Sequence, residues 1–252
     1  MDSEHELLVL AILVGVGIVA GWINTVAGAG SLLLLPALIF AGLPADAANA
    51  TNRISILVQS IFALWGYRRQ GLVVGASERT FTIAAAIGGV IGALIATWLS
   101  APALRDAIVV AMGVMLVLSL VPRKKEAESR TLPIPTALTT FGLFAIGIYG
   151  GFLQAGVGIL VLLFLSLVTG AGLVASNVLK SMLTLALSIV SLVVFASRGE
   201  TIDPILGGAL AIGSAAGGYL GAHATVKLGE KWIRGAIVVA VSLSMIKLLL
   251  DR

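Results

Sequence analysis

Two basic residues, Arg53 and Lys180, stand inside strongly apolar sequence. They come at the start of corresponding segments in the two halves of the chain, one position apart after alignment. An ionisable side chain in such surroundings is costly to bury, and it therefore indicates a functional site. The alternative is that each long side chain only extends to a polar interface. Positive charge at two matching places favours an anionic ligand.

Polar side chains accompany both basic residues at helical spacing. The stripe beside Lys180 consists of Asn177, Ser181, Thr184, Ser188 and Ser191, and the looser one beside Arg53 consists of Asn49, Asn52, Gln59 and Ser60. Steps of four and three residues place each stripe on one helix face, which we expect to face a cavity or the other half of the chain. In an alternative reading, serines such as Ser188 and Ser191 only join two helices.

Two glycine-rich segments occupy matching places ahead of these stripes. The first is Asn24-Thr-Val-Ala-Gly-Ala-Gly-Ser31, and the second is Gln154-Ala-Gly-Val-Gly158. Their glycines allow a broken helix whose backbone N–H groups stay unpaired, and such helix N-termini bind anions. The alternative is that these glycines only allow close helix packing. We predict this packing role for Gly88/Gly92 and Gly217/Gly221.

The predicted substrate site joins both glycine segments to both polar stripes. Its residues are Asn24, Gly28, Gly30, Ser31, Asn49, Asn52, Arg53, Gln154, Gly156, Gly158, Asn177, Lys180 and Ser181. A small anion would bind near the membrane midplane between the two glycine loops.

Enzymatic and metal chemistry find little support in the residue types. All twelve acidic residues lie in tails, loops or segment ends, and the histidines are His5 and His223. No metal cluster can be built from them, and an intramembrane Ser–His pair could use only His223. We therefore expect no catalytic residue, no metal and no cofactor.

The composition identifies the environment. The chain has 252 residues, of which 59% are hydrophobic and 11% charged, and its mean hydropathy is +1.10. Soluble domains are roughly 45–50% apolar and about 25% charged. These values exclude a water-soluble domain, a disordered chain, a disulfide scaffold and ordinary nucleic-acid binding. The lipid bilayer is the expected surrounding, and the basic pI of about 9.7 is typical of a membrane protein with basic cytoplasmic loops.

Apolar runs fill almost the whole chain. The eight long ones are 7–26, 53–66, 80–99, 103–121, 136–152, 182–196, 205–226 and 232–250, and the two short ones are 31–42 and 158–169. A membrane-spanning helix needs about 20 apolar residues. The short runs are either re-entrant or fully spanning, and the sequence leaves both possibilities open.

The chain repeats itself about a charged, proline-rich linker. A shift of 129 residues aligns Gly88–Gly92 with Gly217–Gly221 and Arg105–Ala111 with Arg234–Ala240. The sequence therefore divides into a first repeat over 1–121, a cytoplasmic linker over 122–135 and a second repeat over 136–252. Internal repeats are typical of transporters.

The number of crossings sets the orientation of the repeats. Each has three or five, and because either number is odd, the second repeat enters the membrane from the opposite side. Ten basic residues fall on one face: Arg68, Arg69, Arg79, Arg123, Lys124, Lys125, Arg130, Lys227, Lys231 and Arg234. The other face has three: Arg105, Arg198 and Arg252. The positive-inside rule then predicts that both termini lie outside the cytoplasm.

The motifs resemble those of the TauE/SafE sulfite exporter family. They are Gly28-Ala-Gly-Ser-Leu-Leu-Leu-Leu-Pro-Ala-Leu38, Ala50-Thr-Asn-Arg53 and the second-half echo Gly150-Gly-x-x-x-Ala-Gly-Val-Gly158. The likeness covers almost the whole chain, with two departures: Ala29 replaces a usual glycine, and Asn177-Val-Leu-Lys180 replaces a sequence closer to Gly-Thr-Ser. The resemblance implies transport, generally outward, of small sulfur-containing anions such as sulfite, sulfonates or thiosulfate.

The predicted fold is an all-α polytopic protein of the cell (inner) membrane. It has two inverted repeats, each a broken or re-entrant helical hairpin followed by three transmembrane helices. The predicted mechanism is alternating access by a carrier. An anion channel on the same scaffold is the main alternative, and a membrane-embedded enzyme is a distant one. Neither the coupling ion nor the oligomeric state follows from the sequence.

The topology can be tested with single cysteines, because the chain has none of its own. We expect an impermeant maleimide to label Ser3→Cys in intact cells and to leave Ala127→Cys unlabelled. The opposite pattern of labelling would reverse the orientation.

Overall fold

The computed structural model describes residues 3–72, 75–121, 136–169 and 172–225, together with Ser242 and Leu250. The linker 122–135 and almost all of the last apolar run, 232–250, lie outside these residues. The same holds for Lys227, Lys231 and Arg234. The predicted third spanning helix of the second repeat is therefore outside the described part.

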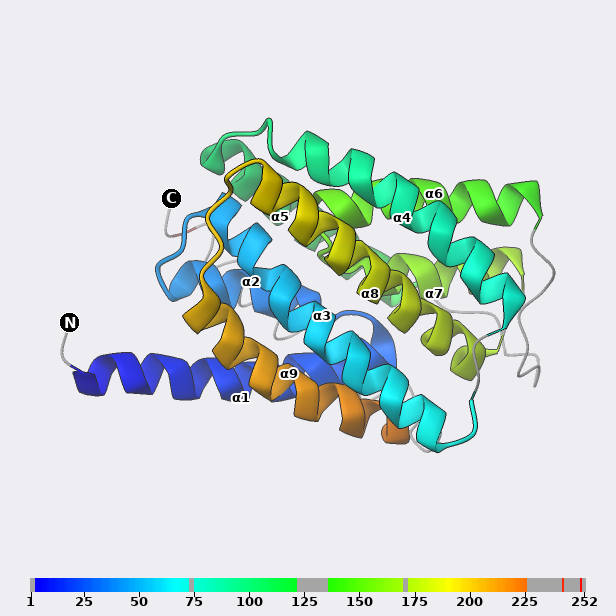
Figure 1. Cartoon of the computed structure of the whole chain (residues 1–252), viewed down its shortest axis with the longest axis horizontal. Coiled ribbons are helices and arrows are strands. Elements are labelled where there is room, and N and C mark those ends of the chain that lie inside the picture. Colours follow the sequence, from blue (N-terminus) through cyan, green and yellow to red (C-terminus); the bar gives the residue numbers. More distant parts are fainter. Residues whose placement is uncertain are drawn as a thin grey trace.

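The described part of the chain is helical and contains no strand. Its helices are α1 Ser3–Ala27, α2 Ser31–Phe40, α3 Ala45–Arg69, α4 Ala76–Ala96, α5 Ala101–Leu120, α6 Ala137–Phe152, α7 Val157–Val168, α8 Leu173–Ser197 and α9 Pro204–Ala224. They run roughly along the long axis of the molecule (Figure 1). The prediction of an all-α protein is confirmed for these residues.

Five of these helices are long and apolar enough to cross a membrane, namely α1, α4, α5, α8 and α9. α2 and α7 have 10 and 12 residues. At 1.5 Å per residue they are roughly 15 and 18 Å long, about half of a 30 Å hydrocarbon core. Neither can cross a bilayer alone.

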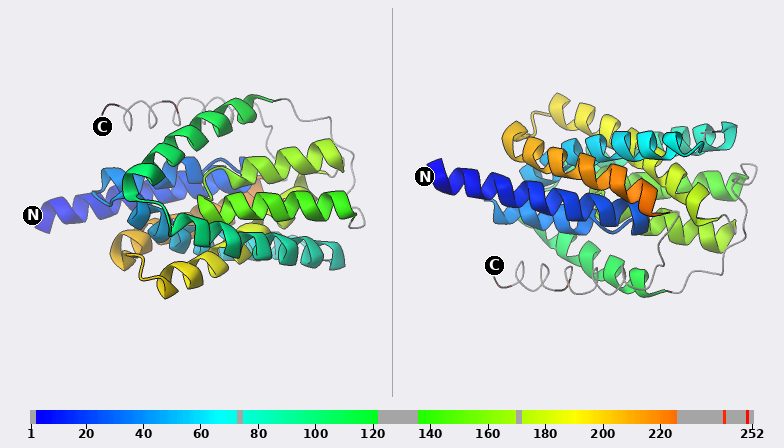
Figure 2. Two further views of the ribbon diagram at one scale, coloured as in Figure 1. Left: turned by 90° about the horizontal axis from the view of Figure 1, so that it is seen from above. Right: turned by 90° about the horizontal axis from the view of Figure 1, so that it is seen from below.

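Each short helix follows a break and turns back along the molecule. α1 ends at Ala27 and α2 begins at Ser31, whereas α6 ends at Phe152 and α7 begins at Val157. The α1–α2 hairpin reaches the centre from the end where α1 begins, and the α6–α7 hairpin reaches it from the opposite end (Figures 1 and 2). The two breaks consequently lie in the interior of the molecule.

The third helix of each half is longer than the hydropathy predicts. The apolar runs 53–66 and 182–196 lie within the 25-residue helices α3 and α8. Placing Arg53 and Lys180 at the start of their segments was therefore wrong, since each lies about two turns inside its helix. Hydropathy misses these first turns because their polar residues are buried against protein rather than exposed to lipid.

The longest helix contacts join the two halves of the chain. α1 packs along α9, and α6 packs along α4. Glycines allow these close approaches: a Cβ at Gly92 would overlap the carbonyl oxygen of Ile148, and one at Gly217 would overlap that of Ile18. The packing role predicted for Gly88/Gly92 and Gly217/Gly221 is confirmed.

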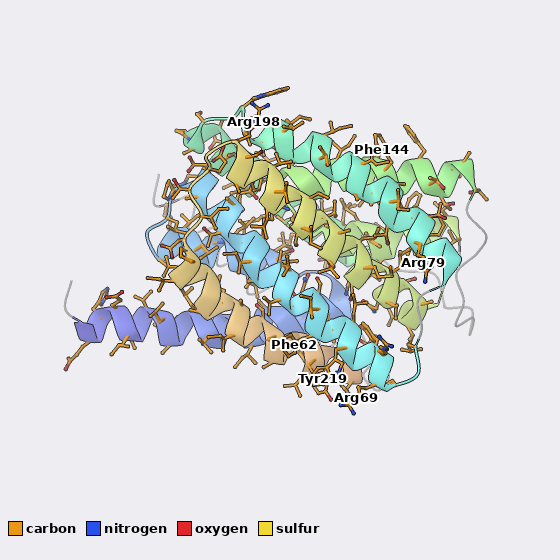
Figure 3. All side chains as sticks on the ribbon, in the orientation of Figure 1. Phe62, Arg69, Arg79, Phe144, Arg198 and Tyr219 are labelled. Atoms are coloured by element: carbon orange, nitrogen blue, oxygen red, sulfur yellow. The ribbon has the colours of Figure 1, made fainter. Side chains whose placement is uncertain are left out.

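Three basic residues of the described part lie at the ends that the sequence predicts for them. Arg69 and Arg79 lie toward one end of the molecule, whereas Arg198 lies at the other end, where α8 stops (Figure 3). The end with Arg69 and Arg79 is the one that the positive-inside rule assigns to the cytoplasm.

Two glycines of α9 offer a matched test of this packing. Gly217→Ala should lower the free energy of unfolding by about 1–3 kcal/mol, because the new methyl group meets the α1 backbone. Gly208 has open space around its Cβ position, so Gly208→Ala should be neutral or gain up to about 1 kcal/mol of helix propensity. Thermal unfolding of the detergent-purified chain measures both. Equal effects would contradict the packing role of Gly217.

Candidate functional site

All thirteen residues of the predicted site are buried. They come from the last turn of α1, from the two breaks with the starts of α2 and α7, and from the first three turns of α3 and α8. Hydrogen bonds and backbone contacts join these elements at the centre of the molecule. The glycine loops and the polar stripes thus form one cluster.

The two breaks touch each other through their backbones. A Cβ on Gly28 would overlap the backbone of Gly158, and a Cβ on Gly158 would overlap that of Gly28. Gly28 and Gly156 also have φ of 79° and 71°, a region that favours glycine. The hydroxyl of Ser31 accepts a hydrogen bond of 2.8 Å from the Gly156 amide. Glycine is therefore required here for packing, with or without a ligand.

Arg53 of α3 binds the C-terminal end of α6. Its guanidinium donates to five oxygens: the carbonyls of Gly150, Gly151 and Phe152 and the side chains of Asn49 and Gln154. The distances to Gly150 and Gly151 are 2.7 and 2.9 Å. The guanidinium also lies 5.3 Å from the ring centre of Phe195. Arg53 is fully buried and does not extend to an interface.

Lys180 of α8 binds the C-terminal end of α1 in the same manner. Its Nζ donates to the carbonyls of Asn24 and Thr25, both at 2.6 Å, and to Oδ1 of Asn177 at 2.5 Å. The Asn177 amide adds a bond of 3.4 Å to the carbonyl of Val26. On the other side, the Asn49 amide donates to the Phe152 carbonyl at 2.9 Å.

These contacts have a common physical cause. The last four carbonyls of a helix lack partners within it, and they carry the negative end of the helix dipole. α1 and α6 both end inside the molecule, where water cannot satisfy these groups. A cation from the opposite half satisfies each end, and each cation in turn gains oxygen partners that replace its hydration.

Two glutamines extend this network around the breaks. Gln154 has a left-handed φ of 57°, which is uncommon for a residue with a side chain. It accepts from Arg53, and its Nε2 donates to the hydroxyl of Ser188 at 3.0 Å. Gln59 of α3 accepts from the Asn24 amide at 2.9 Å. The unusual backbone of Gln154 is thus held by side-chain bonds to two helices.

The cluster is left with polar atoms that lack a partner. The buried side-chain atoms Asn52 Nδ2, Arg53 Nε and Ser191 Oγ form no hydrogen bond. Within the described ranges, the backbone amides of Ala29 and Gly30 in the first break also have no acceptor. Nitrogen donors left in this state need an acceptor, because an unpaired buried polar group costs about 1–3 kcal/mol.

Carboxylates are absent from the buried part of the described chain. Those that the structure places lie near helix ends, such as Asp46 at the start of α3 and Glu200 after α8. Partial burial raises the pKa of Glu200, and the charge of Asp46 adds to this. The centre of the molecule is thus rich in positive charge and in donors.

Several residues of this network were missed by the sequence analysis. The Tyr149 hydroxyl donates a hydrogen bond of 2.5 Å to the carbonyl of Ala155, which lies in the break between α6 and α7. Phe195 lies against Arg53, and Thr25 contributes its carbonyl to Lys180. A tyrosine directly before Gly150-Gly151 could have signalled the first of these. Phe195 and the Thr25 carbonyl leave no recognisable pattern in the sequence.

The described part of the chain is all-helical, has five helices able to span a bilayer and has a charged, buried centre, which together define a polytopic membrane protein. The family model for the sulfite exporter TauE/SafE matches residues 13–248. The chain belongs to this family of membrane transporters, and the family resemblance inferred from the sequence is confirmed. It is a multi-pass protein of the cell membrane and not an enzyme.

Curated relatives agree with this assignment. The chain is 30% identical over 249 residues to the probable membrane transporter protein YfcA of Escherichia coli strain K12, a match that covers 97% of this chain and 91% of that protein. It is 26% identical over 243 residues to the probable membrane transporter protein ORF9 of a Sinorhizobium species, covering 96% and 93%. No solved structure matches the chain significantly.

Removal of one central cation should destabilise the fold. Lys180→Met keeps the length of the side chain but removes the charged donor of the Thr25 carbonyl and of Asn177 Oδ1, while the Asn24 carbonyl keeps the Gly28 amide as a donor. We expect a loss of about 3 kcal/mol or more in the free energy of unfolding, because two buried acceptors lose a charged donor. The exposed Arg198 is the control, and Arg198→Met should stay within about 0.5 kcal/mol. Similar stabilities for the two variants would contradict a structural role for Lys180.

Proposed function

We propose that this protein exports small sulfur-containing anions, such as sulfite, sulfonates or thiosulfate, by alternating access. The observation that carries the proposal is a pair of buried donors without acceptors, Asn52 Nδ2 and Arg53 Nε, in a site whose buried residues also include the cations Arg53 and Lys180. The sulfur chemistry rests on the description of the family.

An anion fits this cluster better than a cation does. Arg53 and Lys180 bring two positive charges, whereas the buried part of the described chain holds no carboxylate. The amides of Ala29 and Gly30 at the start of α2 add donors and the positive end of a helix dipole. A tetrahedral or pyramidal oxyanion presents several acceptor oxygens, which such a set of donors can satisfy together.

An inverted repeat gives this site two routes of access. The support for it is that the two hairpins enter from opposite ends (Figure 2) and that α1 packs on α9 as α6 packs on α4. Each cation also binds the hairpin of the other half. A substrate could then be released toward either side by moving one hairpin at a time, as in other repeat transporters.

The contacts of Arg53 with the end of α6 and of Lys180 with the end of α1 would break in turn during transport. Opening the site along the α6–α7 hairpin requires Arg53 to release the carbonyls of Gly150 and Gly151, whereas opening along the α1–α2 hairpin requires Lys180 to release those of Asn24 and Thr25. A bound anion would offer a cation new oxygen partners during this exchange. In this proposal, the burial of all thirteen site residues supports a closed state of the cycle, with the site open to neither side.

Asn52→Leu separates a binding role from a structural one. Asn52 Nδ2 has no partner, and its Oδ1 meets only the Ser55 hydroxyl at 3.5 Å. The variant should therefore be at least as stable as the parent without ligand, yet lose the stabilisation by sulfite, sulfate, thiosulfate, taurine or sulfoacetate. An anion at 100 times its Kd stabilises by about 2.7 kcal/mol. Thermal shifts of the purified chain measure both effects.

Ser60→Ala is the matched control on the same helix, because Ser60 bonds to Thr184 at 2.9 Å within the protein. It should lower stability slightly and keep the ligand shift. An unchanged shift in Asn52→Leu, or no shift in the parent with any of the anions, would overturn the proposed site. A separate measurement of anion flux in proteoliposomes distinguishes a carrier from a channel. A carrier should show saturation and counterflow, and a channel should show neither.

A further inference from the structure

A groove away from the central cluster lies between α3, α8 and the start of α4. Its volume is about 700 Å³. The apolar part of its lining includes Leu64 and Trp65 of α3 and Met182 and Ile189 of α8, and its polar part includes Arg68 and Arg79. Arg79 lies at the end of the molecule that also carries Arg69 (Figure 3).

This groove opens on the surface that faces the membrane. Trp65 and Ile189 in its wall are 45% and 47% exposed, and the neighbouring Ile61 and Ile83 are 46% and 61% exposed. In a membrane protein such a surface contacts acyl chains. Tryptophan and arginine next to each other are typical of the level of the lipid headgroups.

The charge at the polar end of the groove is positive. Arg68 of α3 and Arg79 of α4 are both exposed, and none of the described side chains that line the groove is acidic. Arg69 lies just outside it, with its guanidinium 5.4 Å from the ring centre of Trp65. Arginine pairs well with phosphate oxygens, and basic pockets between helices on the cytoplasmic side bind anionic lipids.

We propose that this groove binds one anionic phospholipid. Its phosphate lies between Arg68 and Arg79, and an acyl chain follows the apolar wall formed by Leu64, Met182 and Ile189. A soluble anion would satisfy the arginines but leave this wall without a partner, so the complementarity is to a lipid. The lipid would contact α8 at Met182, two residues from Lys180. The inference is independent of the identity of the transported anion.

Quenching of tryptophan fluorescence tests the proposal on the full chain in a neutral detergent. Phosphatidylglycerol with brominated acyl chains should quench part of the emission in a saturable manner, because Trp65 lines the groove. Brominated phosphatidylcholine should need at least a tenfold higher concentration. In Trp65→Phe the saturable part of the quenching should disappear.

Charge variants then locate the headgroup. Arg68→Gln combined with Arg79→Gln should weaken the binding of phosphatidylglycerol at least tenfold, to the level of phosphatidylcholine. Arg198→Gln, at the other end of the molecule, should bind as the parent does. Equal binding of both lipids, or an unchanged affinity in the double variant, would overturn the proposal. Displacement by millimolar glycerol 3-phosphate would assign the arginines to a soluble phosphate instead and would equally overturn it.

Discussion

The carbonyl groups at the ends of α1 and α6 impose the main constraint on this structure. Both helices stop inside the protein, where no water satisfies their last carbonyls. Lys180 supplies the donor for α1, and Arg53 supplies it for α6. Because each cation belongs to the opposite half of the chain, neither hairpin is complete without the other half. The buried charges thus stabilise the broken helices, and the carbonyls of the broken helices in turn stabilise the buried charges.

Glycine makes this arrangement possible at close range. Gly28 and Gly158 let the two breaks touch, and the glycines of α4 and α9 let the hairpins pack along helices of the other half. Helices within a bilayer gain little from hydrophobic burial, so such close backbone contact supplies much of their association. Gly28 and Gly158, which the sequence predicts to lie at an anion site, therefore also hold the two halves together.

Structural and functional roles overlap at the central cluster, yet they are not identical. Most of its polar groups bond to protein, as Ser31 does to Gly156 and Gln154 does to Arg53. Asn52 Nδ2 and Arg53 Nε keep donors that protein does not satisfy. A protein under selection for folding alone would gain stability if these donors had an acceptor within the protein or were replaced by apolar groups. These donors, together with the buried charges of Arg53 and Lys180, favour a small anion as the ligand.

The sequence alone determined the membrane class, the helical fold and the family, because hydropathy, glycine spacing and the motifs around Arg53 depend only on local order. It also identified thirteen site residues, nine polar or charged residues and four glycines, all of which are buried. Only the tertiary structure decided how far α3 and α8 extend, since their polar first turns are buried by protein and escape hydropathy. Tertiary structure alone also revealed that Arg53 and Lys180 bind helix ends of the opposite half. A basic side chain looks the same in sequence whether it faces lipid headgroups, a ligand or a carbonyl 97 or 156 residues away, because its partner depends on the packing of the whole chain.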